Sequence, residues 1–179
     1  DDRGIAVGNL RVRCFQAKEP SYIPWGEAHV DVVLECTGKF RTTQDAKAHL
    51  RESVKKVIIS APAKDATPTY IVGVNHTAYH GERIISNSSC TTNCVTTVLK
   101  VLEDAFGVVR GNMTTIHAVT DSQNLLDNFH KKGVRLRRSA LINLIPTTSG
   151  SAKDVAKLFP HLKGKLPCRA VRVPAPTVS

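Results

Sequence analysis

Residues 86–94 read SNSSCTTNC, and this stretch says more about the chain than any other segment. It follows the apolar run 83–85 and opens an amphipathic segment, residues 95–102. Small hydroxyl residues at such a junction are typical helix caps, so we expect Cys90 at a helix N-terminus. Free backbone N–H groups and the helix dipole stabilise a thiolate there. The same N–H groups can hold a developing oxyanion, which makes Cys90 a candidate nucleophile.

Upstream of Cys90, strand-like and helix-like segments alternate, as in a doubly wound α/β sheet. We expect strands at residues 11–17, 30–37, 56–61, 70–74 and 84–85, and a helix over 42–53. The run 30–37 is nearly all apolar, which predicts a strand buried on both faces of a parallel sheet. Ligands of such sheets bind at the carboxyl ends of the strands. A cofactor edge is therefore expected at residues 37–38 and 60–62.

Downstream of Cys90 the pattern changes. We expect a helix to Phe106 with Gly107 as its C-cap, then a long strand over 108–120. An irregular basic stretch to residue 143 follows, and loops of that length are usually functional. A short helix over 154–159 and a strand over 168–173 complete the pattern. We place a domain boundary near Ser89, which gives a dinucleotide-binding part, 1–89, and a catalytic part, 90–179.

Composition narrows the class of protein. The 179 residues are 41% hydrophobic, and no run approaches the ~20 apolar residues that span a bilayer. Residues 1–4 are polar, so we expect no signal segment there. The number of cysteines, five, is odd, which favours reduced thiols in a cytoplasmic enzyme over a disulfide framework. The net charge of +10 suits anionic substrates and phosphate-rich cofactors. Nucleic acid is less favoured as primary partner, because no aromatic residue lies within the basic run 131–138.

Two further features support a nucleophilic role for Cys90. His117 ends a strand-like run, where an imidazole can pair with a thiolate and relay a proton. Arg138 and Arg172 stand as isolated cations near the hydroxyl run 147–149, a combination that binds phosphate. Taken singly, a lone cysteine is more often structural, a lone histidine more often a satisfied core or surface residue, and a single arginine more often solvated. Together they favour a catalytic centre.

The chain resembles the phosphorylating glyceraldehyde-3-phosphate dehydrogenase family. The resemblance is carried by residues 86–94 and by Thr114-Thr115-Ile116-His117-Ala118-Val119-Thr120. Further support, in order along the chain, comes from residues 25–27, 35–38, 57–64, 73–75, 162–166 and 172–174. The fold that this implies is α/β: the C-terminal part of a Rossmann-type NAD-binding domain, followed by the first part of an α+β catalytic domain with a mostly antiparallel sheet.

The resemblance also implies roles for individual residues. Cys90 would be the nucleophile that forms a thiohemiacetal and then a thioester, and His117 would activate the thiol and stabilise the oxyanion. Inorganic phosphate would be surrounded by Ser89, Thr91, Arg138, Ser149 and Gly150. The substrate's own phosphate would be held by Thr120 and Arg172. One shift of register in the basic loop would move the role of Arg138 to Arg137.

The implied cofactor is NAD, lined by Thr37, Gly38, Ser60 and Ala61. The implied reaction is oxidation of glyceraldehyde 3-phosphate with inorganic phosphate, in a cytoplasmic homotetramer. Residues 119–143 correspond to the family's loop that packs against a neighbouring subunit's cofactor. No G-x-G-x-x-G occurs in the sequence, and the ribose-binding acid and C-terminal helix of the family have no counterpart, so we expect an internal portion of a longer enzyme.

Four alternatives stay open at this point. Erythrose 4-phosphate could be the substrate, or NADP the cofactor. The chain could also be an incomplete, inactive fragment that acts as a binding module through its basic surface. A metal site of Cys90, Cys94 and His117 is the weakest alternative, because it lacks a fourth ligand at a sensible spacing.

Overall fold

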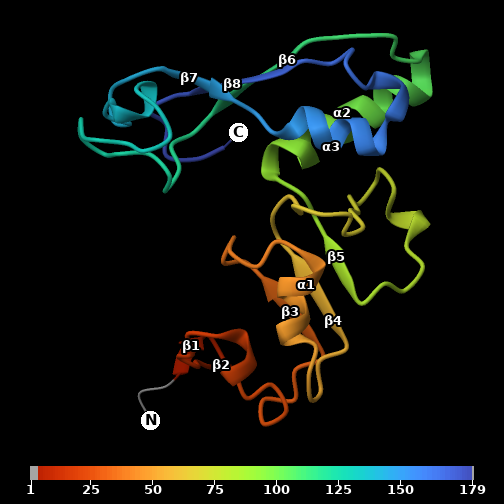
Figure 1. Ribbon diagram of the computed structural model, residues 1–179, viewed down its shortest axis with the longest axis vertical. Helices are drawn as coiled ribbons and strands as arrows, with labels where there is room; N and C mark the ends of the chain where they lie inside the picture. The colour runs from red at the N-terminus through yellow and green to blue at the C-terminus, as the bar shows by residue number, and fades with distance from the viewer. Residues whose placement is uncertain (1–3, 179) are drawn as a thin grey trace. The chain divides into compact units, whose positions relative to one another are not determined.

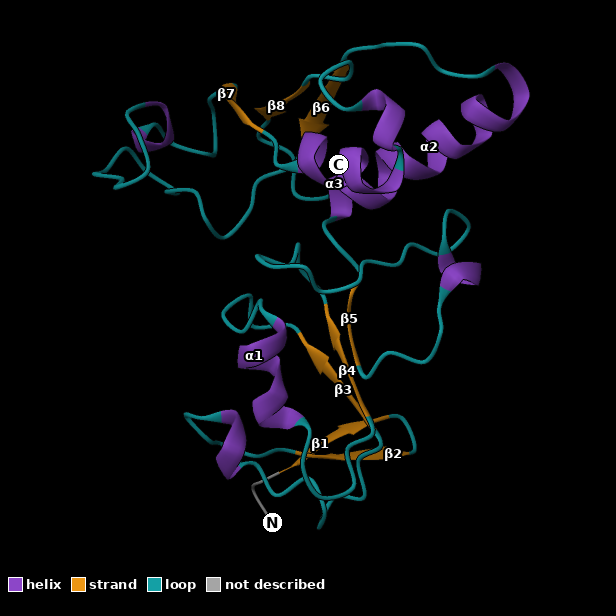
Figure 2. Ribbon diagram, turned by 45° about the vertical axis from the view of Figure 1, so that its right-hand side comes forward, coloured by secondary structure: helices purple, strands orange, loops and turns teal. Residues whose placement is uncertain are grey.

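The computed structural model describes residues 4–178. It divides into two compact units, Asp1–Ser88 and Ser89–Ser179. Figure 1 traces the chain from its N-terminus to its C-terminus, and Figure 2 shows which segments are helix, strand and loop. Both units contain helices and strands, which confirms the predicted α/β class.

A parallel sheet forms the centre of the first unit. Its strands are β3 (Val32–Glu35), β4 (Lys56–Ile59) and β5 (Ile84–Ser86), in the order β3-β4-β5 with both pairs parallel. The three arrows run side by side in both ribbon views (Figures 1 and 2). The core beneath the sheet consists of Val33, Ala46, Val54, Val57, Ile59 and Ile84. The carboxyl ends of all three strands therefore meet at one edge.

The prediction that 30–37 is buried on both faces is wrong for this structure. Val33 and Glu35 are buried, but Val32 is 48% and Leu34 is 64% exposed. Side chains alternate between the faces of a strand, and the described residues cover only one face of β3. The nearly all-apolar composition of residues 30–37 therefore did not distinguish a strand that is covered on one face from a strand that is covered on both faces.

The helix predicted over 42–53 is shorter than expected. It begins where predicted, because the Thr42 hydroxyl accepts a hydrogen bond from the backbone N–H of Asp45. The α-helical part, α1, spans only Thr43–Ala46 and continues as the 3-10 turn η2, Lys47–His49. Ala46, at the end of α1, is fully buried against the sheet.

The strand predicted over 70–74 is also absent. Only Thr69 makes an isolated bridge, to Ser86 of β5. The chain then turns, because the Asn75 side chain accepts from the N–H of Ile71 and Gly73 has a φ of 82°. A short 3-10 helix, η3 (His76–Ala78), follows this turn. Another 3-10 helix, η1 (Pro20–Tyr22), lies before β3.

An antiparallel hairpin, which sequence analysis did not predict, opens the described chain. Strands β1 (Gly4–Val7) and β2 (Leu10–Arg13) pair across a two-residue turn, in which Gly8 has a φ of 58°. The strand expected over 11–17 is thus the second half of this hairpin and ends at Arg13. Its apolar residues are exposed in the structure.

The second unit combines two helices with a mixed sheet. Helix α2 spans Cys90–Phe106 and α3 spans Ser151–Leu158. Strands β6 (Met113–His117), β7 (Ile145–Thr148) and β8 (Cys168–Arg172) form the sheet, in the order β6-β8-β7. The pair β6–β8 is parallel and the pair β7–β8 antiparallel. Two 3-10 turns, η4 (Arg135–Arg137) and η5 (Pro160–Leu162), lie in the connections.

Sequence analysis predicted α2 in full, including its C-cap at Gly107, whose φ is 69°. The strand expected over 108–120 is reduced to β6, because residues outside Met113–His117 do not pair with β8. Helix α3 begins at Ser151 rather than Asp154, and β7 was missed because Pro146 within it is a poor strand former. Among the described residues, no helix combines the length and apolar character needed to cross a membrane.

Candidate active site

Cys90 is the first residue of α2. Ser89 is the N-cap, with an extended backbone (φ −103°, ψ 162°), and its hydroxyl accepts from the N–H of Thr92 at 3.1 Å. This is the capping arrangement that the run of small hydroxyl residues predicts. The Cys90 side chain is exposed and lies at the positive end of a 17-residue helix.

The structure brings His117 to Cys90, although 26 residues separate them in the sequence. The Cys90 Sγ lies 3.5 Å from the His117 Nε2, within hydrogen-bonding distance for sulfur. His117 ends β6 and is 8% exposed, so its ring is held by its surroundings. A nucleophile and a base within hydrogen-bonding distance are the arrangement that covalent catalysis requires.

Arg172 occupies the position in β8 directly beside His117. The two strands are parallel, and His117 pairs with Arg172 in register, so their side chains leave the sheet next to each other. The Arg172 Nη1 contacts the His117 Nδ1 and lies 3.2 Å from the carbonyl oxygen of Ala118. Burial lowers the pKa of the Arg172 guanidinium, and the negative charge of the Cys90 sulfur opposes that shift.

The carbonyl oxygen of Ala118 can only accept, so its 2.8 Å contact with the His117 Nδ1 is a hydrogen bond that the ring N–H at Nδ1 donates. The Arg172 Nη1 donates to the same oxygen at 3.2 Å. With the proton on Nδ1, the His117 Nε2 faces the Cys90 sulfur as an acceptor, as a general base must.

The hydroxyl residues predicted for the phosphate sites lie on or next to three elements of this unit: α2, α3 and β6. Thr91 is 8% exposed beside Cys90, and Ser149 precedes α3, whose N-cap is Gly150. The Ser149 Oγ donates to the Ser151 Oγ at 3.0 Å. Thr120 lies three residues beyond β6, where its N–H donates to the Gln123 side chain at 3.1 Å.

Arg138 shows no contact with this group among the described interactions. It follows the 3-10 turn η4 in the long loop between β6 and β7, where its Nη1 pairs with the Asp127 carboxylate at 3.0 Å. Both side chains of the pair are more than half exposed, which leaves Arg138 weakly held. The neighbouring Arg137 instead stacks over the Phe129 ring, 5.0 Å from its centroid.

The predicted cofactor residues lie at the carboxyl edge of the parallel sheet in the first unit. Thr37 and Gly38 follow β3, and Ser60 and Ala61 follow β4. A side-chain carbon at Gly38, whose φ is 70°, would meet nothing within 4 Å, so the backbone is open to a ligand there. This edge is the position at which open α/β sheets bind nucleotides.

A buried contact between Glu35 and His49, which sequence analysis missed, supports this edge. The Glu35 carboxylate accepts from the N–H of Thr37 at 2.8 Å, and also from the Thr37 hydroxyl. Its other oxygen lies 2.9 Å from the His49 Nε2, and both side chains are nearly inaccessible. Glu35 thus shapes the turn that carries Thr37. An acidic residue inside an apolar strand was the available signal.

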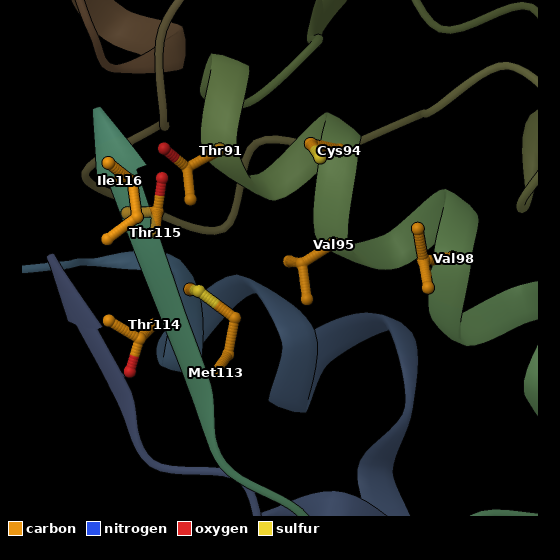
Figure 3. Close-up of a pocket in the computed structure, with 8 residues that line it drawn as sticks. All are labelled: Thr91, Cys94, Val95, Val98, Met113, Thr114, Thr115 and Ile116. Carbon is orange, nitrogen blue, oxygen red and sulfur yellow. The ribbon is translucent and has the colours of Figure 1, made fainter. Parts of the chain in front are cut away.

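A cavity of about 410 Å³ lies between α2 and β6 (Figure 3). The surface of the cavity is mainly apolar, and its lining includes Cys94, Val95, Val98 and Met113 together with three threonines. Such a lining does not suit a phosphate group. Cys94 therefore borders an apolar space, whereas Cys90 contacts His117. Within residues 4–178, no three His, Cys, Asp or Glu side chains come together as a metal site would require.

Two family models match this chain. The model described as glyceraldehyde 3-phosphate dehydrogenase, C-terminal domain, matches residues 89–179, which is just over half of the chain. The chain belongs to the glyceraldehyde-3-phosphate dehydrogenase family. The family's NAD binding domain matches residues 1–43. Cys90, His117 and Arg172 all lie within the segment that the C-terminal domain model matches.

Similar proteins carry the same family name. The chain is 47% identical over 179 residues to the glyceraldehyde-3-phosphate dehydrogenase of Bacteroides fragilis, and covers 54% of that protein. It is 51% identical over 177 residues, 98% of its length, to the Mycobacterium avium protein, of which it covers 52%. A chloroplastic glyceraldehyde-3-phosphate dehydrogenase A from Scenedesmus vacuolatus is 48% identical over 181 residues, with 57% covered. The chain spans about half the length of these curated relatives.

Proposed function

We propose that this member of the glyceraldehyde-3-phosphate dehydrogenase family takes part in the NAD-dependent, phosphate-requiring oxidation of glyceraldehyde 3-phosphate to 1,3-bisphosphoglycerate. The observation that carries the proposal is the 3.5 Å contact between the Cys90 Sγ, at the start of α2, and the His117 Nε2. The names of the similar proteins support the same reaction.

Covalent chemistry at Cys90 is the first part of the proposal. The thiolate adds to the aldehyde carbon of the substrate and forms a thiohemiacetal. The His117 Nε2, which faces the sulfur, takes the thiol proton and then donates a hydrogen bond to the oxygen on which negative charge develops. Backbone N–H groups in the first turn of α2 add to this stabilisation. The His117 Nε2 would take the hydroxyl proton of the adduct as a hydride leaves its carbon for NAD, which converts the adduct to a thioester. An oxygen of inorganic phosphate would then attack the carbonyl carbon and release the Cys90 thiolate.

Two anion sites complete the proposal for the second unit. Ser89, Thr91, Ser149, Gly150 and Arg138 would surround inorganic phosphate, while Thr120 and Arg172 would hold the phosphate of the substrate. The position of Arg172, beside His117 and partly buried, supports a fixed charge-assisted contact with the substrate. Arg138 would have to exchange its exposed ion pair with Asp127 for the phosphate.

The sheet edge of the first unit fits a nicotinamide cofactor. Thr37, Gly38, Ser60 and Ala61 would line NAD, because they share the carboxyl edge of parallel strands and the Gly38 backbone is open. The Thr37 hydroxyl is directed to Glu35, which fixes the turn against which the cofactor would lie. NAD, when bound, supplies the hydride acceptor for the oxidation.

A homotetramer forms the last part of the proposal. The loop between β6 and β7 exposes Leu125, Leu126, Phe129, Leu141 and Ile142. Large apolar side chains at this density on one loop favour a protein partner over water. A neighbouring subunit, as the family resemblance implies, would cover them.

Steady-state kinetics of the protein as its gene encodes it tests the function. We expect NADH absorbance to rise only when aldehyde, NAD and inorganic phosphate are all present. Cys90→Ser should abolish turnover, and His117→Ala should lower kcat by roughly 10²- to 10⁴-fold, because a positioned acid–base group is lost. Cys94→Ser is the matched control and should keep activity. Turnover of Cys90→Ser at the wild-type rate would contradict the proposal.

A further inference from the structure

Four hydroxyl groups form a continuous line between the start of α2 and the start of α3. The Ser89 Oγ lies 2.8 Å from the Thr92 Oγ1, which donates to the Ser151 Oγ at 3.2 Å. The Ser149 Oγ donates to the same Ser151 oxygen at 3.0 Å. The line therefore runs Ser89, Thr92, Ser151, Ser149, across two segments that lie about 60 residues apart in the sequence.

The two inner members are removed from water. Thr92 is 0% and Ser151 is 2% exposed, whereas Ser89 and Ser149 are half-buried. A buried hydroxyl without a hydrogen bond is unfavourable, and the contacts of the line supply hydrogen bonds to both inner hydroxyls. Only the outer two can reach a ligand.

Each outer serine is held twice by one inner residue. The N–H of Thr92 donates to the Ser89 Oγ at 3.1 Å, and the N–H of Ser151 donates to the Ser149 Oγ at 3.3 Å. Because the single proton of the Thr92 hydroxyl goes to Ser151, the Ser89 hydroxyl is the donor in its own contact with Thr92. The rotamers of both outer serines are thus set from inside the protein.

We infer that Thr92 and Ser151 are positioning residues for the inorganic-phosphate site. The inference rests on the proposed function, in which Ser89 and Ser149 belong to that site. Thr92 and Ser151 do not contact phosphate themselves. Their contact joins the Ser89 end of the site to the Ser149 end and keeps both oxygens at a fixed separation. Without it, the anion would have to order two independent serines when it binds.

Variants that lack one inner hydroxyl test this inference, in the protein as its gene encodes it. Thr92→Val keeps the shape of the side chain, and Ser151→Ala removes only the oxygen. Each should raise the KM for inorganic phosphate by roughly fivefold, the effect of about one hydrogen bond. The KM values for aldehyde and NAD should stay within about twofold, since neither reactant touches the line. The double variant should resemble the single variants, because all three break the same Thr92–Ser151 contact.

Two controls separate positioning from a general loss of structure. Thr96 lies one turn further along α2, is 0% exposed, and donates to the Thr92 carbonyl oxygen at 2.7 Å without joining the line. Thr96→Val should therefore leave the KM for phosphate unchanged. Thr92→Ser keeps the hydroxyl and should also keep the wild-type value. If Thr92→Val does not fold, Ser151→Ala and Thr92→Ser still show whether the Thr92–Ser151 contact affects the KM for inorganic phosphate.

The outcomes distinguish this inference from the proposed function. If the unsubstituted protein oxidises the aldehyde without any need for phosphate, the proposed function fails. If phosphate is required and Ser151→Ala leaves its KM unchanged, only the positioning inference is overturned. An equal rise in the KM values for all three reactants, or a rise for Thr96→Val as large as that for Ser151→Ala, would also overturn it.

Discussion

Cys90 and Cys94 lie one helical turn apart and are both exposed, yet their surroundings differ. Cys90 is at the N-terminus of α2 and contacts His117, while Cys94 borders the apolar cavity between α2 and β6. Reactivity of a cysteine follows stabilisation of its thiolate more than exposure alone. The two residues therefore form a natural comparison within one helix.

Selective alkylation is the first prediction at this scale. Iodoacetamide should modify Cys90 far faster than Cys14, Cys36, Cys94 or Cys168 in the protein as its gene encodes it. Burial raises the pKa of the Cys168 thiol, so that residue serves as a slow reference. Peptide mass mapping after short exposures measures the rates. Equal labelling of Cys90 and Cys94, or protection of Cys90 in the absence of ligand, would show that Cys90 is not the nucleophile.

The two proposed arginine roles predict different kinetic responses. Arg172→Ala should raise the KM for the phosphorylated aldehyde by roughly 10- to 100-fold, because a charge-assisted hydrogen bond is lost. It should also lower kcat, since Arg172 contacts the His117 ring and donates to the same Ala118 carbonyl oxygen as that ring. Arg138→Ala should instead raise the KM for inorganic phosphate.

Arg169 provides the control for both variants. It lies in the same strand as Arg172 but is exposed, so Arg169→Ala should leave both KM values unchanged. Each reactant is varied in turn at saturating levels of the others. If Arg172→Ala and Arg138→Ala both change only the KM for inorganic phosphate, the two anion sites have been assigned to the wrong residues.

At the scale of elements, the start of α1 depends on a carboxylate from outside the helix. The Asp65 Oδ2 accepts from the N–H of Thr43 at 2.8 Å, and its Oδ1 accepts from the N–H of Thr67 at 3.0 Å. The hydrogen bond from the Thr67 hydroxyl lowers the pKa of Asp65, and the two backbone N–H donors act in the same direction. Asp65 therefore joins the first turn of α1 to the segment that follows β4.

This arrangement predicts an acid-dependent stability. The pKa of Asp65 is lower in the folded state, so its contribution is present above the ordinary value near 3.8 and is lost as the pH falls through the folded value. Asp65→Asn should reduce the free energy of unfolding at pH 7 by less than about 1 kcal/mol, since the group is exposed. Urea unfolding of the protein as its gene encodes it, at pH 7 and at pH 3, measures the difference.

The control for Asp65→Asn is Asp104→Asn, which removes only an exposed i,i+4 ion pair with Lys100. The difference between wild type and Asp65→Asn should shrink in acid. A difference that stays constant, or grows, from pH 7 to pH 3 would mean that the carboxylate charge of Asp65 does not stabilise α1.

At the scale of the whole molecule, the described chain exposes many apolar side chains. They include Val32 and Leu34 on β3, Val101 and Phe106 on α2, and Ile116 on β6. The sequence contains no G-x-G-x-x-G, and within residues 4–178 no α-helix precedes β3; a glycine-rich turn followed by a helix is what holds a pyrophosphate in dinucleotide-binding domains. A sheet edge alone provides only part of a nucleotide site.

The isolated 179-residue polypeptide should therefore bind no NAD and show no turnover. It should also fold poorly, because strands with exposed apolar faces and edges associate with one another. Calorimetric titration with NAD and a dehydrogenase assay test this, with the protein as its gene encodes it as the positive control. Micromolar binding of NAD by the isolated polypeptide would show that the nucleotide site is built in another way.

Local sequence determined the elements whose signals are short-range. The N-cap at Ser89, the length of α2 and its end at Gly107 follow from capping hydroxyls, an amphipathic period and a positive φ, all within one segment. The parallel sheet followed from apolar runs separated by turns. The candidate residues Cys90, His117 and Arg172 could be named from their residue types and from the family resemblance.

Tertiary structure decided what depends on distant neighbours. Only the parallel pairing of β6 with β8 brings Arg172 beside His117, and only the packing of α2 near β6 brings Cys90 to the same imidazole. The buried pair of Glu35 and His49, and the line from Ser89 through Thr92 and Ser151 to Ser149, join residues that no local pattern connects. Hydrogen bonds of this kind depend on distance and direction in space, which a linear sequence does not contain.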